Sequence, residues 1–215
     1  MRVSIIDYKT SNLHSVKAAC EKVGITSRIT SKPNELLSSD AAILPGVGSF
    51  SGAIQNIRQL GLEEAILNFV SSGKPLFGIC LGLQLLFEKS EEFGTHEGLS
   101  LIRGKVKRFD FSNGNCHKYP VPQIGWNKII SKNQSWKGTF LDNCDEGTYM
   151  YFVHSFYVEP EDEAVILSTS VYGNQQYCSS IKKENIFATQ FHPEKSGHIG
   201  LEIYRSFKNY LSINL

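Results

Sequence analysis

The stretch Lys74-Pro-Leu-Phe-Gly-Ile-Cys80-Leu-Gly-Leu-Gln-Leu-Leu-Phe87 begins as a short apolar run and then changes its periodicity. From Leu81 to Glu88 the residues follow the spacing of three and four that is typical of a helix. Between strand and helix lies Gly78-Ile-Cys-Leu-Gly82, whose glycines allow the two backbones to approach closely. The stretch therefore predicts a nucleophile elbow, in which a strand turns sharply into a helix with a reactive side chain at the corner.

Cys80 is the candidate nucleophile at this corner. The N–H groups and the dipole at a helix N-terminus favour a thiolate there. The same N–H groups can stabilise an oxyanion on a substrate carbonyl. A buried cysteine without catalytic function is the alternative, since free cysteine also behaves as a small hydrophobic residue.

The composition points to one ordinary globular domain over residues 1–215. The chain has 22 basic and 21 acidic residues and a net charge of +1, so neither a nucleic acid nor a membrane is the expected partner. No apolar run approaches the roughly 20 residues of a membrane helix, and the start of the chain has too short an apolar run for a signal peptide. We therefore expect a cytoplasmic protein.

The five cysteines are scattered and form no CxxC pair, so the sequence predicts neither a disulfide framework nor a metal site. A reducing compartment agrees with this usage. We expect no metal and no cofactor.

The first 90 residues alternate β-rich runs with helical patterns, which predicts a parallel sheet with right-handed crossovers. The expected strands are residues 2–6, 27–30, 41–44 and the run before Cys80. The expected helices are residues 13–23, 52–60 and 62–72, followed by the elbow helix.

After Glu92 the chain becomes rich in β-branched and aromatic residues separated by turns. The expected strands there are residues 105–109, 125–130, 148–153, 165–170 and 177–181, followed by a strand at 186–192 and a helix at 200–211. The sequence thus predicts an α/β fold: a mainly parallel open sheet flanked by helices, with an added antiparallel section.

A cysteine nucleophile needs a base, and the base needs a group that orients it. His192 ends an apolar strand, and Glu194 follows two residues later. Because active sites of open α/β sheets lie at the carboxyl ends of strands, a strand ending in His192 beside the strand ending in Cys80 would join thiol and imidazole. Glu194 would fix the tautomer of the imidazole. His154, at the end of another β-rich run, is a second candidate base.

Three distant stretches together resemble the class I (triad) glutamine amidotransferases, which have a flavodoxin-like fold. They are Gly46-Val-Gly48, Gly78-Ile-Cys-Leu-Gly82 and Gln190-Phe-His-Pro-Glu194. A narrower resemblance is to the glutaminase subunits of imidazole glycerol phosphate synthases in histidine biosynthesis. It is carried by residues 45–50, 125–127, 151–155 and 192–196 and covers essentially the whole chain.

The resemblance implies hydrolysis of L-glutamine through a Cys80–His192–Glu194 triad. Backbone N–H groups of Val47, Gly48 and Leu81 would form the oxyanion hole. The implied substrate-binding residues are Gly46, Gly48, Gln84, Glu92, His154 and Ser155. Gln84 stands among leucines, so we expect its amide to be partly buried and hydrogen-bonded.

The resemblance also implies a partner, a (β/α)8 barrel cyclase subunit that receives ammonia in a heterodimer. Asn12, Trp126 and Lys195 match family positions that face the cyclase. A tryptophan in the core and a solvated lysine are the alternative readings of two of them.

Two stretches depart from the usual family pattern. Asp7-Tyr-Lys-Thr-Ser-Asn12 lacks glycines between Tyr8 and Asn12, and Pro122-Gln-Ile-Gly125 lacks a His-Met pair before the glycine. Both lie towards the partner, so a paralogous subunit that supplies ammonia for amidino sugars of surface polysaccharides is an alternative. A stand-alone cysteine γ-glutamyl hydrolase or small amidase is another, and a non-catalytic regulatory subunit is a third.

Overall fold

The computed structural model describes residues 2–9, 12–111, 119–132 and 135–214. Their largest element is a twelve-stranded mixed sheet. Five strands run parallel in the order β2-β1-β3-β4-β14. Their bounds are β1 Val3–Ile6, β2 Ser27–Thr30, β3 Ala41–Leu44, β4 Leu76–Ile79 and β14 Ile186–Thr189.

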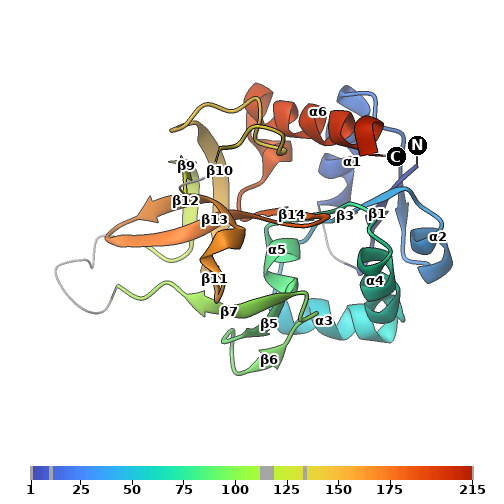
Figure 1. Ribbon diagram of the computed structural model, residues 1–215. Coiled ribbons are helices and arrows are strands. Elements are labelled where there is room, and N and C mark those ends of the chain that lie inside the picture. The colour runs from blue at the N-terminus through green and yellow to red at the C-terminus, as the bar shows by residue number, and fades with distance from the viewer. Residues whose placement is uncertain (1, 10–11, 112–118, 133–134, 215) are drawn as a thin grey trace.

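Helices cover both faces of this parallel part (Figure 1). On one face lie α1 (Leu13–Lys22) and α6 (Gly197–Asn214). On the other lie α3 (Phe50–Gln59), α4 (Leu62–Ser71) and the short elbow helix α5 (Leu81–Leu85). A further short helix, α2 (Pro33–Leu37), contacts α4 near the edge of the sheet.

Alternate residues of the parallel strands enter two separate hydrophobic cores. Ile5 and Ile43 pack with α1 and α6, whereas Ile6 and Leu44 pack with α3, α4 and α5. Strands that are buried on both faces read as continuous apolar runs, which is why the sequence identified them.

The antiparallel section continues from β14. From β14 outward the order of the strands is β13 (Gln175–Lys183), β11 (Phe156–Pro160), β7 (Ile102–Arg108), β5 (Phe87–Ser90) and β6 (His96–Glu97). In addition, β12 (Ile166–Tyr172) pairs with β13, and β9 (Ile130–Ser131) pairs with β12. All these pairings are antiparallel except β5 with β7. The single-turn 3-10 helix η1 (Glu163–Val165) directly precedes β12, and a second one, η2 (Pro193–Lys195), lies between β14 and α6.

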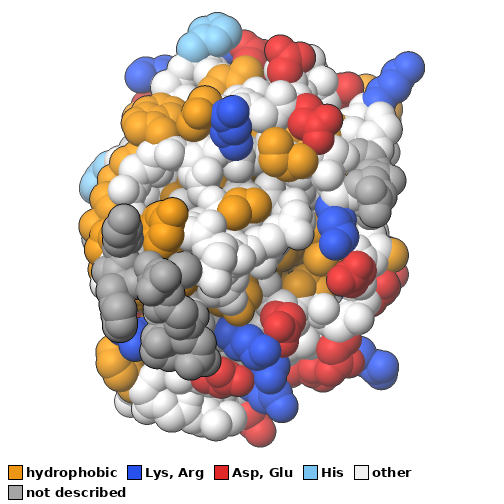
Figure 2. Space-filling model, turned by 90° about the vertical axis from the view of Figure 1, so that its left-hand side faces the viewer, with side chains coloured by type: hydrophobic (Ala, Val, Ile, Leu, Met, Phe, Trp, Pro, Cys, Tyr) orange, Lys and Arg blue, Asp and Glu red, His pale blue; other side chains and the backbone are white. Residues whose placement is uncertain are grey.

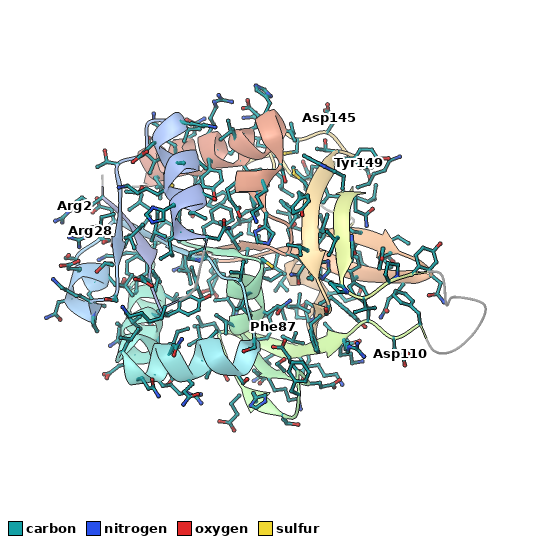
Figure 3. The ribbon with its side chains drawn as sticks, turned by 180° about the vertical axis from the view of Figure 1, so that it is seen from behind. Arg2, Arg28, Phe87, Asp110, Asp145 and Tyr149 are labelled. Carbon is teal, nitrogen blue, oxygen red and sulfur yellow. The ribbon has the colours of Figure 1, made fainter. Side chains whose placement is uncertain are left out.

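A separate antiparallel ribbon of β8 (Gln123–Lys128) and β10 (Tyr149–His154) lies beside this section. Its inner face buries Met150 and Phe152. Its outer face leaves Ile124, Trp126 and Tyr149 exposed. Figure 3 shows Tyr149 on this ribbon, far from Arg2 and Arg28 at the opposite end of the molecule.

The two glycines of the elbow lie where the sequence requires close contact. A Cβ atom on Gly82 would stand 1.8 Å from the carbonyl oxygen of Leu44 on β3. One on Gly78 would stand 2.9 Å from Cβ of Ala188 on β14, and 3.2 Å from the carbonyl carbon and oxygen of Gly82 in the elbow helix. The predicted close approach of strand and helix is confirmed.

Several boundaries differ from the predictions. The elbow helix ends at Leu85, and the residues from Phe87 form strand β5 instead of another helical turn, because β6 and β7 pair with them. The short elements α2, β6 and β11 were not predicted. The last parallel strand ends at Thr189, three residues before His192.

Candidate active site

Cys80 lies at the corner between β4 and α5 with φ of 54° and ψ of −107°. A positive φ is uncommon for a residue with a side chain and is maintained only where the surrounding structure enforces it. The thiol is almost buried, at 6% exposure. Its Sγ lies 3.6 Å from Nε2 of Gln190 and 3.9 Å from the carbonyl oxygen of Val153.

His192 comes to the same edge of the sheet because β14 and β4 are parallel neighbours, with Thr189 opposite Ile79. The predicted proximity of these two strands is confirmed. The imidazole is fully buried, and its Nδ1 lies 2.7 Å from Oε1 of Glu194. A carboxylate only accepts, so Nδ1 carries the proton. Nε2 is buried and has no hydrogen-bond partner among the described residues.

The charge of His192 follows from its neighbours. Burial lowers its pKa, but the interactions with Cys80 and Glu194 outweigh burial and raise the pKa to about 10. The imidazole of His192 is therefore held as an imidazolium at neutral pH, close to the sulfur of Cys80.

Glu194 has a second neighbour that the sequence did not reveal. Nδ2 of Asn12 donates a hydrogen bond of 2.6 Å to Oε1, the same oxygen that binds His192. Asn12 precedes α1 with φ of 78° and makes no capping hydrogen bond through its side chain. Its amide thus holds the carboxylate of Glu194 instead of capping the helix.

A cavity of about 410 Å³ opens next to Cys80. Its size suits a small-molecule ligand. Nine of the residues singled out in the sequence line it: Val47, Gly48, Cys80, Leu81, Gln84, Glu92, His154, Ser155 and Lys195. Gly46 does not line it. A Cβ atom at Gly46 would stand 1.9 Å from the hydroxyl oxygen of Tyr8, which itself donates a 2.5 Å hydrogen bond to the carbonyl of Pro45.

Gln84 and His154 meet at one backbone carbonyl. Nε2 of Gln84 donates to the carbonyl oxygen of Phe156 at 2.9 Å, and Nδ1 of His154 donates to it at 2.8 Å. The expectation that Gln84 is buried and hydrogen-bonded is confirmed. Burial and, to a smaller extent, the charge of His192 lower the pKa of His154 to about 4, so His154 is neutral. Its buried Nε2 is an acceptor that has no hydrogen-bond partner in the part of the chain that the structure describes.

Glu92 reaches the cavity from the loop after β5. One of its carboxylate oxygens accepts a hydrogen bond from the backbone N–H of Phe50, the first residue of α3. Ser49, which precedes that helix, makes no side-chain cap, so Glu92 satisfies a helix-terminal N–H in its place.

The residues expected at a partner interface lie at the surface with one exception. Trp126 is 55% exposed, so the alternative reading as a core tryptophan is wrong. Lys195 is exposed and lines the cavity, whereas Asn12 is half-buried. Figure 2 shows hydrophobic side chains gathered along one border of the end of the molecule that carries β9, β10 and β12.

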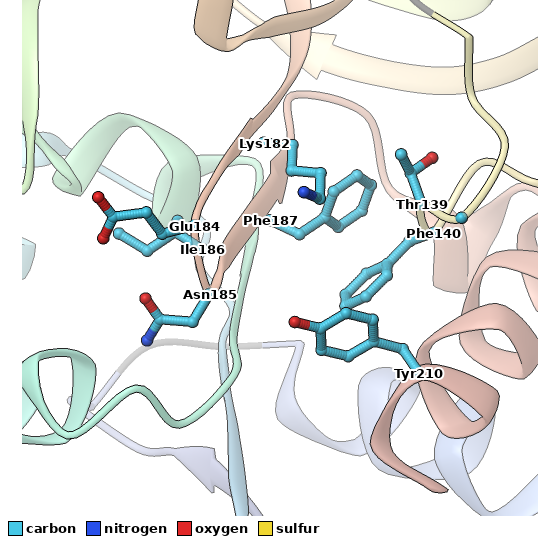
Figure 4. A pocket seen from close by; sticks show the side chains of 9 residues that line it. Thr139, Phe140, Lys182, Glu184, Asn185, Ile186, Phe187 and Tyr210 are labelled. Carbon is cyan, nitrogen blue, oxygen red and sulfur yellow. The ribbon is translucent and has the colours of Figure 1, made fainter. Parts of the chain in front are cut away.

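The hollow in Figure 4 is not a comparable site. It lies beside the start of β14, where the rings of Phe140 and Phe187 approach to 4.3 Å between centroids. Its volume of about 10 Å³ is at most that of one water molecule.

Among the residues that the structure describes, no three His, Cys, Asp or Glu side chains are grouped so as to hold a metal ion. The expectation of a metal-free, cofactor-free enzyme stays a prediction.

The sequence comparison identifies the class. The family "Glutamine amidotransferase class-I" matches residues 4–207. The chain therefore belongs to the class I glutamine amidotransferases. Two solved structures, a glutamine amidotransferase and PurLQS from Thermotoga maritima, superpose with TM-scores of 0.73 at 18% and 21% identity, each covering 98% of both chains. They bear out the α/β fold.

Closer relatives narrow the family. The imidazole glycerol phosphate synthase subunit HisH of Wolinella succinogenes is 45% identical over 205 residues, which cover 95% of this chain and 98% of that protein. HisH of Geobacillus sp. (strain WCH70) is 44% identical over 211 residues, covering 98% and 96%. Within its class the chain is a member of the HisH family. No helix in the described part of the chain is long and apolar enough to cross a membrane.

Proposed function

We propose that residues 1–215 act as one domain that hydrolyses L-glutamine to glutamate and ammonia with Cys80 as nucleophile, His192 as acid and base, and Glu194 as the group that orients His192. The observation that carries this proposal is the buried Nδ1–carboxylate contact of 2.7 Å at the sheet edge where Cys80 is held in a strained corner. A triad is recognised by such geometry and roles.

In the first half of the reaction the Cys80 thiolate attacks the side-chain amide carbon of glutamine. The backbone N–H groups of Leu81 and of Val47 or Gly48 stabilise the oxyanion that forms, each contributing about 3–4 kcal/mol in comparable enzymes. The intermediate then collapses, the C–N bond breaks, and His192 gives its proton to the departing ammonia. A γ-glutamyl thioester on Cys80 remains.

In the second half, neutral His192 removes a proton from water, and the resulting hydroxide attacks the thioester. The C–S bond breaks, glutamate leaves, and the thiolate–imidazolium pair is restored. Glu194 keeps Nδ1 protonated throughout, so that Nε2 faces the sulfur and the substrate.

The polar residues of the 410 Å³ cavity suit the α-amino and α-carboxylate groups of glutamine. Both hydrogens of the Gln84 amide are used, by the carbonyl of Phe156 and by Oε1 of Gln190. Gln84 therefore offers its oxygen, an acceptor that suits an ammonium group. Glu92 and Nε2 of His154, which has no hydrogen-bond partner among the described residues, are further acceptors, and Ser155 and the N–H groups of Val47 and Gly48 are donors for a carboxylate.

We propose that the ammonia passes to a (β/α)8 cyclase subunit that forms imidazole glycerol phosphate in histidine biosynthesis. Two observations support this: the relatives at 42–45% identity are named as subunits of imidazole glycerol phosphate synthase, and Trp126 and Lys195 are both exposed, Lys195 at the cavity. The described cysteines Cys20, Cys80, Cys144 and Cys178 are free thiols, which suits a cytoplasmic location.

The test is glutamine hydrolysis by the chain alone and with a histidine-pathway cyclase barrel and its ligand. We expect strong stimulation by the barrel and loss of activity in Cys80→Ala. Cys144→Ala, which changes a buried thiol outside the cavity, is the matched control and should remain active.

Three outcomes would contradict parts of the proposal. Unchanged ammonia production in Cys80→Ala would remove this site from catalysis. Silence with the histidine-pathway barrel, in a protein whose Cys80 still reacts quickly with iodoacetamide, would favour a paralogous cyclase. Full activity without any partner would favour a stand-alone hydrolase.

A further inference from the structure

Gln190 is a fully buried polar side chain whose position the triad does not explain. It follows β14 directly, and its backbone N–H bonds the carbonyl of Ser179 on β13 at 2.9 Å. Its side chain points to the reacting sulfur, with Nε2 3.6 Å from Sγ of Cys80. A distance of this size is usual for an N–H group that donates to sulfur, because sulfur is larger than oxygen.

The orientation of the Gln190 amide is fixed by two successive hydrogen bonds, the first of which is to a backbone carbonyl. The oxygen of Phe156 can only accept, so the group of Gln84 that faces it at 2.9 Å must be the NH2. The same NH2 lies 3.1 Å from Gln190, which must therefore present its oxygen to Gln84. The NH2 of Gln190 is thereby left to face Cys80, and a flipped amide would break the bond to Gln84.

The sulfur thus has two polar neighbours, one that favours the thiol and one that favours the thiolate. The carbonyl oxygen of Val153, at 3.9 Å, accepts a hydrogen bond from a thiol and repels a thiolate. The N–H of Gln190 donates to a thiolate and has little to offer a thiol. Because Gln190 is buried, water does not compete for this donor, and hydrogen bonds to charged groups are stronger than those between neutral groups.

We infer that Gln190 is a further catalytic residue: it donates an N–H to Sγ of Cys80 and stabilises the thiolate, with Gln84 as the positioning residue that fixes its orientation. The donor acts twice in the cycle, on the attacking thiolate and on the thiolate expelled when the thioester is hydrolysed. The second action rests on the proposed glutaminase function, whereas the first does not. For this reason the main test needs no glutamine.

The test is the rate of Cys80 alkylation by iodoacetamide in the full-length chain as a function of pH, followed by mass spectrometry of the Cys80 peptide. In Gln190→Leu we expect the midpoint of the rate–pH curve to rise by about one pH unit, so that the rate below the midpoint falls about tenfold. In Gln190→Glu, which has nearly the same shape, the carboxylate faces the thiolate, and the midpoint should rise further than in Gln190→Leu.

The matched control is Gln123→Leu. Gln123 is also a buried glutamine, but its side chain accepts a hydrogen bond from Tyr177 at 3.1 Å and does not contact the sulfur. It should lose stability without a change in the alkylation midpoint. If Gln190→Leu does not fold, the near-isosteric Gln190→Glu carries the test alone. Wild-type midpoints in the folded Gln190 variants would overturn the inference.

Glutamine hydrolysis in the complex with the cyclase gives a second readout. Gln190 does not line the described cavity, so kcat of Gln190→Leu should fall about tenfold or more while KM stays close to that of the wild type. A change of KM alone would overturn the assignment, since it would mean that Gln190 acts on substrate binding. If the midpoint moves as expected but wild-type protein hydrolyses no glutamine with any cyclase, the thiolate donor stands and the proposed function fails.

Discussion

The parallel and antiparallel parts of the molecule contribute to the candidate site in different ways. The parallel part supplies the groups that we propose to react, because β4 leads into Cys80 and β14 leads towards His192. The antiparallel ribbon supplies fixed backbone groups: the carbonyl of Tyr151 binds the N–H of His192 at 2.9 Å, and that of Val153 faces Sγ. The proposed reacting side chains thus follow the ends of parallel strands, and backbone carbonyls of the ribbon hold them in position.

The same ribbon has an outer face with exposed Ile124, Trp126 and Tyr149. One strand, β10, therefore has one side towards the catalytic residues and the other towards solvent. A partner docked on the outer face would contact the strand whose carbonyls position His192 and Cys80. The four changes below separate the contributions of the two parts.

The largest effect is expected from His192→Ala. Removing the acid and base of a triad typically costs about four orders of magnitude or more in kcat. The measurement is the rate of glutamate formation in the complex. His198→Ala, which removes an exposed imidazole from α6, is the control and should retain wild-type activity. Comparable activity of the two variants would mean that the parallel part does not supply the base.

The next effect is on stability. A methyl group at Gly82 would stand 1.8 Å from the carbonyl of Leu44, so Gly82→Ala must separate the elbow from β3 and should cost about 3 kcal/mol or more of unfolding free energy. Gly52→Ala in α3 meets only the rotatable hydroxyl of Ser49 at 2.9 Å and should be neutral or stabilising. Chemical denaturation measures both. Equal stability of the two variants would show that the close approach at the elbow is not required.

The antiparallel ribbon should give the protein an acid-sensitive component through His154. Its pKa is lowered to about 4 in the folded state from an ordinary value near 6.5, so the unfolded chain binds the proton more readily. This contribution is fully present above about pH 6.5 and is lost as the pH falls towards 4, amounting to roughly 3 kcal/mol.

His154→Gln keeps a donor for the carbonyl of Phe156 and removes the titration, so its stability should fall less between pH 6.5 and 4. Unfolding free energies at several pH values measure the difference. His14→Gln, on an exposed position of α1, is the control. A wild-type pH dependence in His154→Gln would mean that another group causes the acid sensitivity.

The smallest effect is expected from Trp126→Ala. If the outer face of the ribbon binds the cyclase, loss of this half-exposed ring should weaken the complex by about 2 kcal/mol, or roughly thirtyfold, and leave alkylation of Cys80 in the isolated chain unchanged. The affinity is measured by calorimetry. Ile213→Ala removes an 82% exposed apolar side chain from the end of α6, whose C-terminus lies away from the ribbon in Figure 1, and should have no effect. Equal affinities of the two variants would exclude the ribbon as the docking face.

The sequence predicted best where local rules are sufficient. A continuous apolar run identified β3 with the bounds that the structure has, because a strand buried on both faces leaves no polar alternation. The prediction failed at the residues after Leu85, where a helical spacing continues but β6 and β7 pair with the chain and form β5 instead. Local propensity is a weak preference, and long-range pairing overrides it.

The residues of the candidate site also fall into two groups, those that local motifs predict and those that only long-range contacts reveal. The sequence by itself predicted Cys80 as the nucleophile, His192 as its base and Glu194 as the group that orients the base, because Gly-x-Cys-x-Gly and His-Pro-Glu are contiguous motifs whose chemistry depends on their own residues. Only the tertiary structure decided that Asn12 holds Glu194 and that Gln190 faces Cys80, across 182 and 110 residues of chain. Contacts between such distant residues depend on strand order and register, which emerge only when the whole sheet is assembled.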